Sequence, residues 1–247
     1  MTLGTSMQAY GEPTYWDNRY VQDPGPFDWY QKYPSLAPLF HQYVRRDHRI
    51  LVVGCGNAVF SEGMVDDGYR DVVNIDISSV VIEAMQKKCQ DRPELKYIKM
   101  DVQDMSAFEA GYFDAVIDKG TLDSLMCGHN SQQNVTKMLE EVGRVLKNKG
   151  VYILITYGAP IYRLHLLRDL CMWTIKLHVI GIIDLNMILA EKPVAERTTE
   201  HTKWELTDPV PLDEGSSSVD AALGKNPEVH YIYVCTKDNS LRESSIR

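Results

Sequence analysis

Gly54, Gly56 and Asp76 have the types and the spacing of residues that bind a nucleotide. The apolar run 50–53 ends in Gly54-Cys55-Gly56-Asn57, and a second apolar run, 72–75, ends at Asp76. Glycine lets the backbone approach a ligand closely, and a carboxylate can accept hydrogen bonds from both ribose hydroxyls. The pattern predicts a βαβ unit that binds a nucleotide.

A third acid follows a third apolar run. Residues 95–100 are predicted to form a strand, and Asp101-Val102 comes directly after it. Because ligands of open parallel sheets bind outside the carboxyl ends of the strands, Asp101 is expected near Gly54 and Asp76. Its carboxylate can accept a hydrogen bond from an adenine amino group.

The missing third glycine decides which nucleotide is expected. A dinucleotide-binding loop has the pattern G-x-G-x-x-G, but Val59 stands three positions after Gly56. The third glycine allows close helix packing beneath a pyrophosphate, so its absence argues against a dinucleotide oxidoreductase. S-adenosylmethionine has an adenine, a ribose and no pyrophosphate. Its sulfonium is also compatible with nearby acids and aromatic faces.

The stretch Asp118-Lys119-Gly120-Thr121-Leu122-Asp123 follows the predicted strand 113–117. Asp118 and Asp123 are the catalytic candidates, because methyl transfer to an amine requires alignment of the amine and loss of its proton. Asp118 would orient an ammonium group or pass its proton to water. In the alternative interpretation, Asp118 caps the next helix and Asp123 is a solvated acid in its first turn.

An aromatic arm is predicted over residues 13–35. Trp16 and Tyr20 are four positions apart and would share one face of a short helix, and Phe27 follows the Pro24-Gly25-Pro26 link. The arm either packs as a lid over the edge of the core or closes over a cationic cofactor. Residues 1–12 are predicted to be disordered.

The remaining pattern predicts an α/β fold with a three-layer, Rossmann-like, seven-stranded sheet that is mostly parallel and has a late antiparallel strand. The strands are expected at residues 50–53, 72–75, 95–100, 113–117, 151–156, 174–180 and 230–235. Helices are expected between them, the longest over 134–146. Residues 13–247 are interpreted as a single domain, with a mobile insertion at about 191–227 that is rich in proline, glycine and serine.

The motifs resemble class I S-adenosylmethionine-dependent methyltransferases. More specifically, Tyr15-Trp16-Asp17-Asn18-Arg19-Tyr20, Phe27-Asp28-Trp29-Tyr30 and the 118–123 stretch are similar to the eukaryotic methyltransferase-like family that includes lysine methyltransferases of translation elongation factor 1-alpha. The resemblance covers roughly residues 10–158. It implies cofactor contacts at Trp16, Tyr20, Phe27, Gly54, Asp76, Ile77, Asp101, Val102 and Lys119. Phe27 occupies a place where a relative carries tyrosine.

Cys55, Gly56 and Asp118 complete the predicted cofactor site. Cys55 is interpreted as a small filler of a crowded turn and not as a nucleophile. Lys119 is expected to contact the cofactor through its backbone or aliphatic stem, with its ammonium directed away.

Composition restricts the other classes of function. The formal charge of −8 argues against a general nucleic-acid binder and suits a basic protein partner. The five cysteines are scattered without a C-x-x-C pair, and the seven histidines lack a metal-binding spacing, so no metal is predicted. The chain is expected to be cytoplasmic, because neither a secretory leader nor a membrane span is recognised.

These observations predict a methyltransferase that uses S-adenosylmethionine. The resemblance implies that it acts on a protein lysine, with a translation elongation factor as the candidate substrate. Two alternatives stay open at this point. One is a small-molecule N- or O-methyltransferase, for which the 191–227 insertion would form a substrate lid. The other is a non-catalytic module that keeps the cofactor pocket for stability or for recruitment of a partner.

Overall fold

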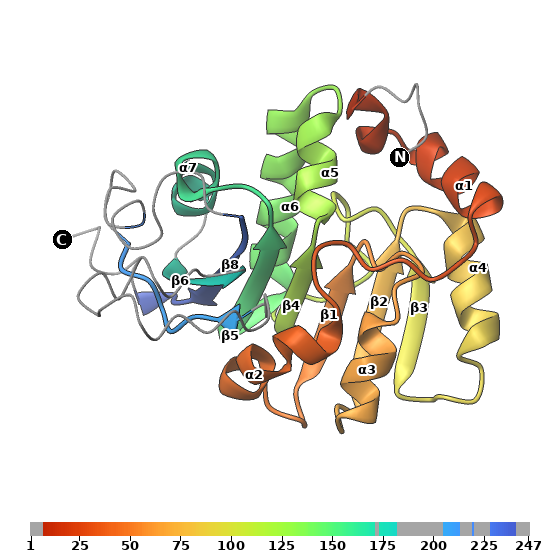
Figure 1. The fold of residues 1–247 in the computed structure, drawn as a ribbon, viewed down its shortest axis with the longest axis horizontal. Helices are drawn as coiled ribbons and strands as arrows, with labels where there is room; N and C mark the ends of the chain where they lie inside the picture. Colours follow the sequence, from red (N-terminus) through yellow and green to blue (C-terminus); the bar gives the residue numbers. More distant parts are fainter. Residues whose placement is uncertain (1–6, 171–172, 182–204, 213–218, 220–227, 241–247) are drawn as a thin grey trace, which may run out of the picture.

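A mixed β-sheet organises the computed structural model, which describes residues 7–170, 173–181, 205–212, 219 and 228–240. The strand order is β3-β2-β1-β4-β5-β8-β6-β7, and Figure 1 shows the sheet from β3 on the right to β6 on the left. The parallel strands are β1 (Arg49–Val53), β2 (Asp71–Asp76), β3 (Leu95–Lys99), β4 (Phe113–Lys119) and β5 (Leu146–Thr156).

The last third of the described chain adds antiparallel pairing. Strand β8 (Val229–Lys237) lies between β5 and β6 (Trp173–Gly181) and runs antiparallel to both. The predicted seven-stranded sheet with a late antiparallel strand is therefore confirmed. The two-residue strand β7 (Glu205–Leu206) pairs with the end of β6 and adds an eighth strand that the sequence pattern did not indicate.

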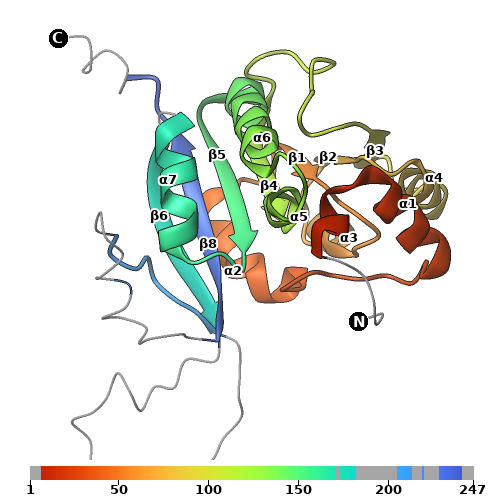
Figure 2. The ribbon, with the colours of Figure 1, turned by 90° about the horizontal axis from the view of Figure 1, so that it is seen from above.

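Helices cover both faces of the sheet, as Figure 2 shows for α6 and α2. One face carries α5 (Thr121–Cys127), α6 (Ser131–Val145) and α7 (Pro160–Leu170). The other carries α2 (Tyr33–Tyr43), α3 (Phe60–Asp66) and α4 (Ser79–Lys88). These are the three layers that the sequence predicts.

Alternation along the central strands divides the core between the two faces. In β1, Leu51 and Val53 pack toward α5 and α6, whereas Ile50 and Val52 pack toward α2 and α3. All four side chains are buried, which is why these strands read as continuous apolar runs. The stripe on α6 is fully buried at the spacing of three and four residues that predicted the helix, at Val135, Met138, Leu139, Val142 and Val145.

The N-terminal segment differs in part from the prediction. Residues 1–6 lie outside the described part, and Met7–Gly11 forms a 3-10 helix (η1) within the segment that was predicted to be disordered. Gly11 packs against Gly128 at the end of α5, where an added Cβ would lie 2.2 Å from the Gly128 Cα. This backbone contact holds η1 in place. Local sequence could not indicate it, because Gly128 lies far along the chain.

The predicted arm contains α1 (Pro13–Gln22), followed by a link to α2. Figures 1 and 2 show η1 and α1 at the edge where β1 and β2 end, with α1 beside α4. Most of the 191–227 insertion lies outside the described residues. Its described part, 205–212, contains β7 and runs along β6. Within the described residues, no helix is both long and apolar enough to span a membrane.

Candidate active site

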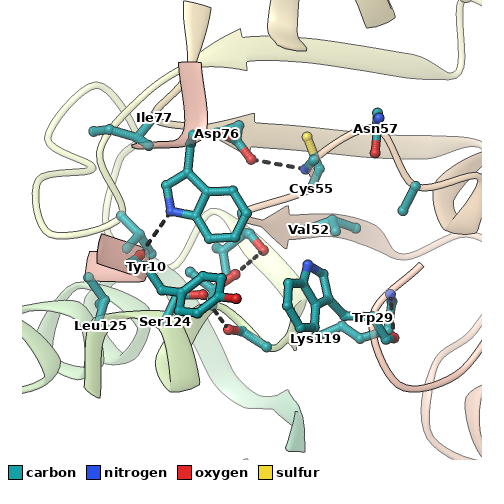
Figure 3. Close-up of a pocket in the computed structure, with 18 of the residues that line it drawn as sticks. Tyr10, Trp29, Val52, Cys55, Asn57, Asp76, Ile77, Lys119, Ser124 and Leu125 are labelled. Atoms are coloured by element: carbon teal, nitrogen blue, oxygen red, sulfur yellow. Dashed lines mark hydrogen bonds between the residues drawn. The ribbon is translucent and has the colours of Figure 1, made fainter. Parts of the chain in front are cut away.

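A pocket opens at the carboxyl ends of β1, β2 and β4, beneath the N-terminal arm (Figure 3). It encloses about 1130 Å³ of space, part of which is open to solvent. Eleven of the predicted cofactor residues line it: Trp16, Tyr20, Phe27, Gly54, Cys55, Gly56, Asp76, Ile77, Asp101, Val102 and Lys119. Asp118 and Asp123 do not.

The turn after β1 brings the backbone into the pocket. Gly54 and Gly56 have φ angles of +57° and +55°, a conformation that glycine adopts without a Cβ penalty. A Cβ on Gly54 would lie 2.0 Å from Oγ1 of Thr121, and one on Gly56 would lie 2.8 Å from the Tyr20 hydroxyl. Both glycines therefore satisfy a requirement of the fold as well as of a ligand. Cys55, between them, has a thiol pKa raised by burial, which fits its interpretation as a filler.

Asp76 forms the acidic wall of the pocket. Its Oδ2 accepts a hydrogen bond from the Gly56 amide at 2.9 Å, and its Oδ1 accepts one from the Ser78 amide at 2.9 Å. Each oxygen keeps acceptor capacity for a ligand. Because burial outweighs these backbone hydrogen bonds, the pKa of Asp76 rises to about 6, so the carboxyl is ionised at pH 7 and close to its titration range.

The end of β3 supplies the neighbouring wall. Asp101 lines the pocket and accepts a hydrogen bond from the Gln103 amide at Oδ1, while Oδ2 accepts none from the residues that the structure describes. Val102 is buried beside it, and Ile77 lies next to Asp76, as Figure 3 shows. The three strand ends therefore converge as the sequence predicts, and they place two acids and two apolar side chains around one space.

Aromatic rings from the arm close the pocket on the side away from the sheet. Trp16 and Tyr20 are stacked, with centroids 6.0 Å apart, and Trp29 meets both Trp16 and Phe27 edge to face. Tyr10, which the sequence did not indicate, accepts a hydrogen bond from the Trp16 indole at its carbonyl. Rings arranged in this way can stack on a flat base. Their faces also attract cations such as a sulfonium.

Asn57 fastens the arm to the glycine turn and was not recognised as a site residue. Its Nδ2 donates to the Gly25 carbonyl at 2.5 Å, and its Oδ1 accepts from the Phe27 amide at 3.2 Å. One side chain therefore satisfies two backbone groups of the Pro24-Gly25-Pro26-Phe27 link. The only signal in the sequence was an asparagine directly after Gly-x-Gly.

The Lys119 side chain is turned away from the pocket that its stem lines. Its Nζ donates to the Trp29 carbonyl at 2.9 Å and lies 3.4 Å from Oδ1 of Asp28, in a pair whose side chains are 8% and 4% exposed. Burial lowers the pKa of the ammonium, and the Asp28 carboxylate opposes that shift. This arrangement agrees with the expectation that the charge points away from a cationic ligand, and it ties the arm to the end of β4.

Asp118 lies behind the pocket and not in it. The side chain is fully buried and accepts hydrogen bonds from the Thr121 amide at 2.8 Å, the Leu122 amide at 3.2 Å and the Tyr152 hydroxyl at 2.9 Å. Burial raises its pKa to about 7. The geometry fits the capping alternative and does not support the prediction that Asp118 contacts the cofactor or the acceptor. Local spacing indicated the strand end correctly but not the direction of the side chain.

Asp123 differs from both of its predicted roles. It accepts hydrogen bonds from the hydroxyls of Tyr30 and Thr156, from the Tyr157 amide and from the Arg163 guanidinium, at distances between 2.6 and 3.3 Å. Its side chain is 15% exposed, so it is not a solvated acid. With four donors around two oxygens, it joins the arm to β5 and α7 rather than offering a free base.

The lining fits S-adenosylmethionine on observations of this chain. The glycine cradle admits no Cβ at two positions, Asp76 has acceptor capacity beside it, and the cover is aromatic. Gly54, Gly56, Asp76 and Asp101 would hold the nucleoside, and the rings of the arm would face the sulfonium. Within the described residues, no group of three or more potential metal ligands was found.

Comparisons with known proteins point to one family. A family model described as a methyltransferase domain matches residues 51–154. The chain is 34% identical over 178 residues to the mouse protein named EEF1A lysine methyltransferase 4, a match that covers 68% of this chain and 69% of the relative. It is 37% identical over 201 residues to the human protein named eEF1A lysine and N-terminal methyltransferase, covering 76% of this chain and 28% of that protein.

Length and fold complete the comparison. The chain spans between 22% and 28% of the first curated relatives that it matches. A solved structure of a TehB-like SAM-dependent methyltransferase from Corynebacterium glutamicum superposes with a TM-score of 0.51 at 14% identity, covering 94% of this chain and 98% of that one. At this identity the likeness concerns the fold alone.

Proposed function

This chain belongs to the family of S-adenosylmethionine-dependent methyltransferases that includes EEF1A lysine methyltransferase 4, and we propose that it methylates a lysine side chain of a protein. The observation that carries the proposal is the pocket. It combines a two-glycine turn, the Asp76 carboxylate and an aromatic cover at one edge of the sheet. The names of the relatives support lysine as the acceptor and a translation elongation factor as the candidate substrate.

The cofactor supplies an electrophilic methyl group on a sulfonium. A neutral lysine nitrogen would take up this methyl group with S-adenosylhomocysteine as the leaving group, and the proton of the lysine ammonium would first be released to water. Alignment of the lysine nitrogen with the methyl group is the main task of the protein, since good orientation of two reacting groups can lower the activation barrier by several kcal/mol. We assign the orientation of the cofactor to Asp76 and the aromatic arm, and the exclusion of water to Trp16, Tyr20 and Trp29.

Asp118 and Asp123 have no proton-accepting role in this proposal. Asp118 is sealed behind α5, and both oxygens of Asp123 already accept two hydrogen bonds. Proton loss from an amine of pKa near 10.4 then depends on solvent at the open side of the pocket. We expect the reaction to take place in the cytoplasm, without nucleic acid.

Transfer of labelled methyl from S-adenosylmethionine into an undialysed cell extract, followed by removal of the unreacted cofactor, tests the proposal. The extract is separated into protein and small-molecule fractions, and labelled proteins are digested and mapped by mass spectrometry. Label on lysine in the protein fraction is the expected result. Label in the small-molecule fraction would favour the alternative acceptor class, and tight cofactor binding without any transfer would favour the non-catalytic module.

A further inference from the structure

A row of four rings leads from the pocket to the surface. Trp29 lines the pocket, and its ring centroid lies 6.2 Å from that of Tyr30. Tyr30 lies 4.9 Å from His230 of β8, and His230 lies 6.1 Å from Tyr157, which directly follows β5. Tyr157 is 69% exposed. The aromatic row (Trp29, Tyr30, His230 and Tyr157) is therefore continuous from the cofactor pocket to solvent, although its members come from three distant parts of the sequence.

The row is held in place from below by one carboxylate. Asp123 accepts the Tyr30 hydroxyl at 2.6 Å and the Tyr157 amide at 3.3 Å, both at Oδ2. Its other oxygen accepts from Thr156 and Arg163, which are buried. Because a buried acid with four donors keeps a defined position, it fixes the Tyr30 hydroxyl and the backbone at Tyr157.

Tyr30 has an unusual backbone conformation. Its φ angle is +61°, which a bulky residue rarely adopts. The surroundings over-determine this conformation through the Asp123 hydrogen bond and through contact with Gly120, where an added Cβ would lie 3.3 Å from the Tyr30 ring. Strained residues held in this way are concentrated at functional sites.

The row can accept a cation. Gln31 Nε2 lies 3.0 Å from Nδ1 of His230 and can only donate, so Nδ1 accepts and is unprotonated. Burial also lowers the pKa of His230, which keeps the ring neutral at pH 7. The row thus presents neutral rings above the Asp123 carboxylate. Aromatic faces attract an ammonium group, and the methylene stem of a lysine packs well along them.

We infer that the aromatic row receives the acceptor lysine side chain. Tyr157 contacts the substrate protein at the point where this lysine side chain enters. This inference rests on the proposed function and adds the residues that select the acceptor. The formal charge of −8 favours approach of a lysine-bearing surface. Trp29 belongs to the aromatic row and also lines the pocket. In this inference, the amine therefore meets the methyl group beside Trp29.

Tyr157→Ala is the variant that tests the inference, because an exposed side chain can be removed without disturbing the core. The protein fraction of a cell extract serves as the acceptor over a dilution series, with labelled S-adenosylmethionine at saturation. Tyr162→Ala is the matched control, since Tyr162 is 64% exposed on α7 and lies outside the row. Tyr157→Phe keeps the ring and removes only the hydroxyl. Calorimetry measures cofactor affinity for each variant.

Tyr157→Ala is expected to raise the half-saturating acceptor concentration about 2- to 5-fold, which corresponds to roughly 0.5–1 kcal/mol, the strength of one cation–π contact at an exposed ring. Cofactor affinity should stay unchanged, and Tyr157→Phe and Tyr162→Ala should behave like the wild type. Equal half-saturation for Tyr157→Ala and wild type, or an equal increase for Tyr162→Ala, would overturn the inference while leaving the proposed function standing. A wild-type protein that labels no protein at all would overturn both.

Discussion

At the scale of single residues, Asp76 is the side chain on which cofactor affinity should depend most. Its two oxygens are already fixed by the Gly56 and Ser78 amides, so the acceptor positions toward the pocket are set before a ligand arrives. A hydrogen bond to a charged group contributes roughly 1.5–3 kcal/mol. Asp76→Asn is therefore expected to weaken S-adenosylmethionine binding by about 10- to 100-fold in calorimetry.

Asp71→Asn is the matched control at the other end of the same strand. Asp71 pairs with Arg49 and Lys96, away from the pocket, and its loss should leave the dissociation constant unchanged.

The pH dependence of cofactor affinity gives a second readout for Asp76. Because the pKa of Asp76 is raised to about 6, the carboxylate is lost as pH falls through 6, and affinity should fall between pH 7 and 5. Two results would contradict this role of Asp76: an affinity of Asp76→Asn equal to that of the wild type, or the same pH dependence of affinity in Asp76→Asn and in the wild type.

At the scale of elements, the arm is a separate segment that the strand ends hold over the pocket. Asn57 ties it to β1, the Lys119–Asp28 pair ties it to β4, and a hydrogen bond between Ser78 and Asp17 ties it to α4. None of these links belongs to a helix or strand ladder. Opening of the arm would therefore break these side-chain contacts and no strand pairing.

Asn57→Ala is expected to accelerate release of S-adenosylmethionine several-fold, because the hydrogen bonds of the Asn57 side chain to the link at residues 24–27 are lost. Stopped-flow fluorescence of the arm tryptophans measures the release rate, and urea unfolding measures stability. Asp23→Ala is the control, since it breaks only an exposed pair with Arg19 on the same arm, a contact worth at most about 1 kcal/mol. A release rate for Asn57→Ala equal to that of Asp23→Ala would show that the arm is not held by Asn57.

At the scale of the whole molecule, cofactor binding should stabilise the fold because the pocket joins the arm to three strand ends. A ligand that binds only the folded state at 100 times its dissociation constant adds about 2.7 kcal/mol to the free energy of unfolding. S-adenosylmethionine is expected to raise the thermal midpoint accordingly in scanning calorimetry. NAD at the same concentration should not, since Val59 replaces the glycine that a pyrophosphate loop needs. A larger shift with NAD would overturn the choice of cofactor.

Local patterns were sufficient for the elements that carry the cofactor site. Gly54, Gly56, Asp76 and Asp101 are each attached to the end of an apolar run, and parallel strands bring such ends to one edge. The helix expected over 134–146 was readable for the same reason, since the buried stripe of α6 depends on neighbours within a few residues. The seven-residue helix α5 was indicated only in the alternative interpretation of Asp118 and Asp123, because it is too short to display a clear period.

Tertiary structure alone decided which acids face the pocket and how the arm closes it. Asp118 and Asp123 are five residues apart, yet one is sealed against Tyr152 and the other binds Tyr30, 93 positions away. The contact between Gln31 and His230 spans 199 positions, and β8 enters the sheet between strands that precede it. By itself, the sequence determined the strand ends, the glycine turn and the cofactor class. The aromatic row and the burial of each carboxyl required the fold, because a side chain's partners across the sheet leave no periodic trace in the chain.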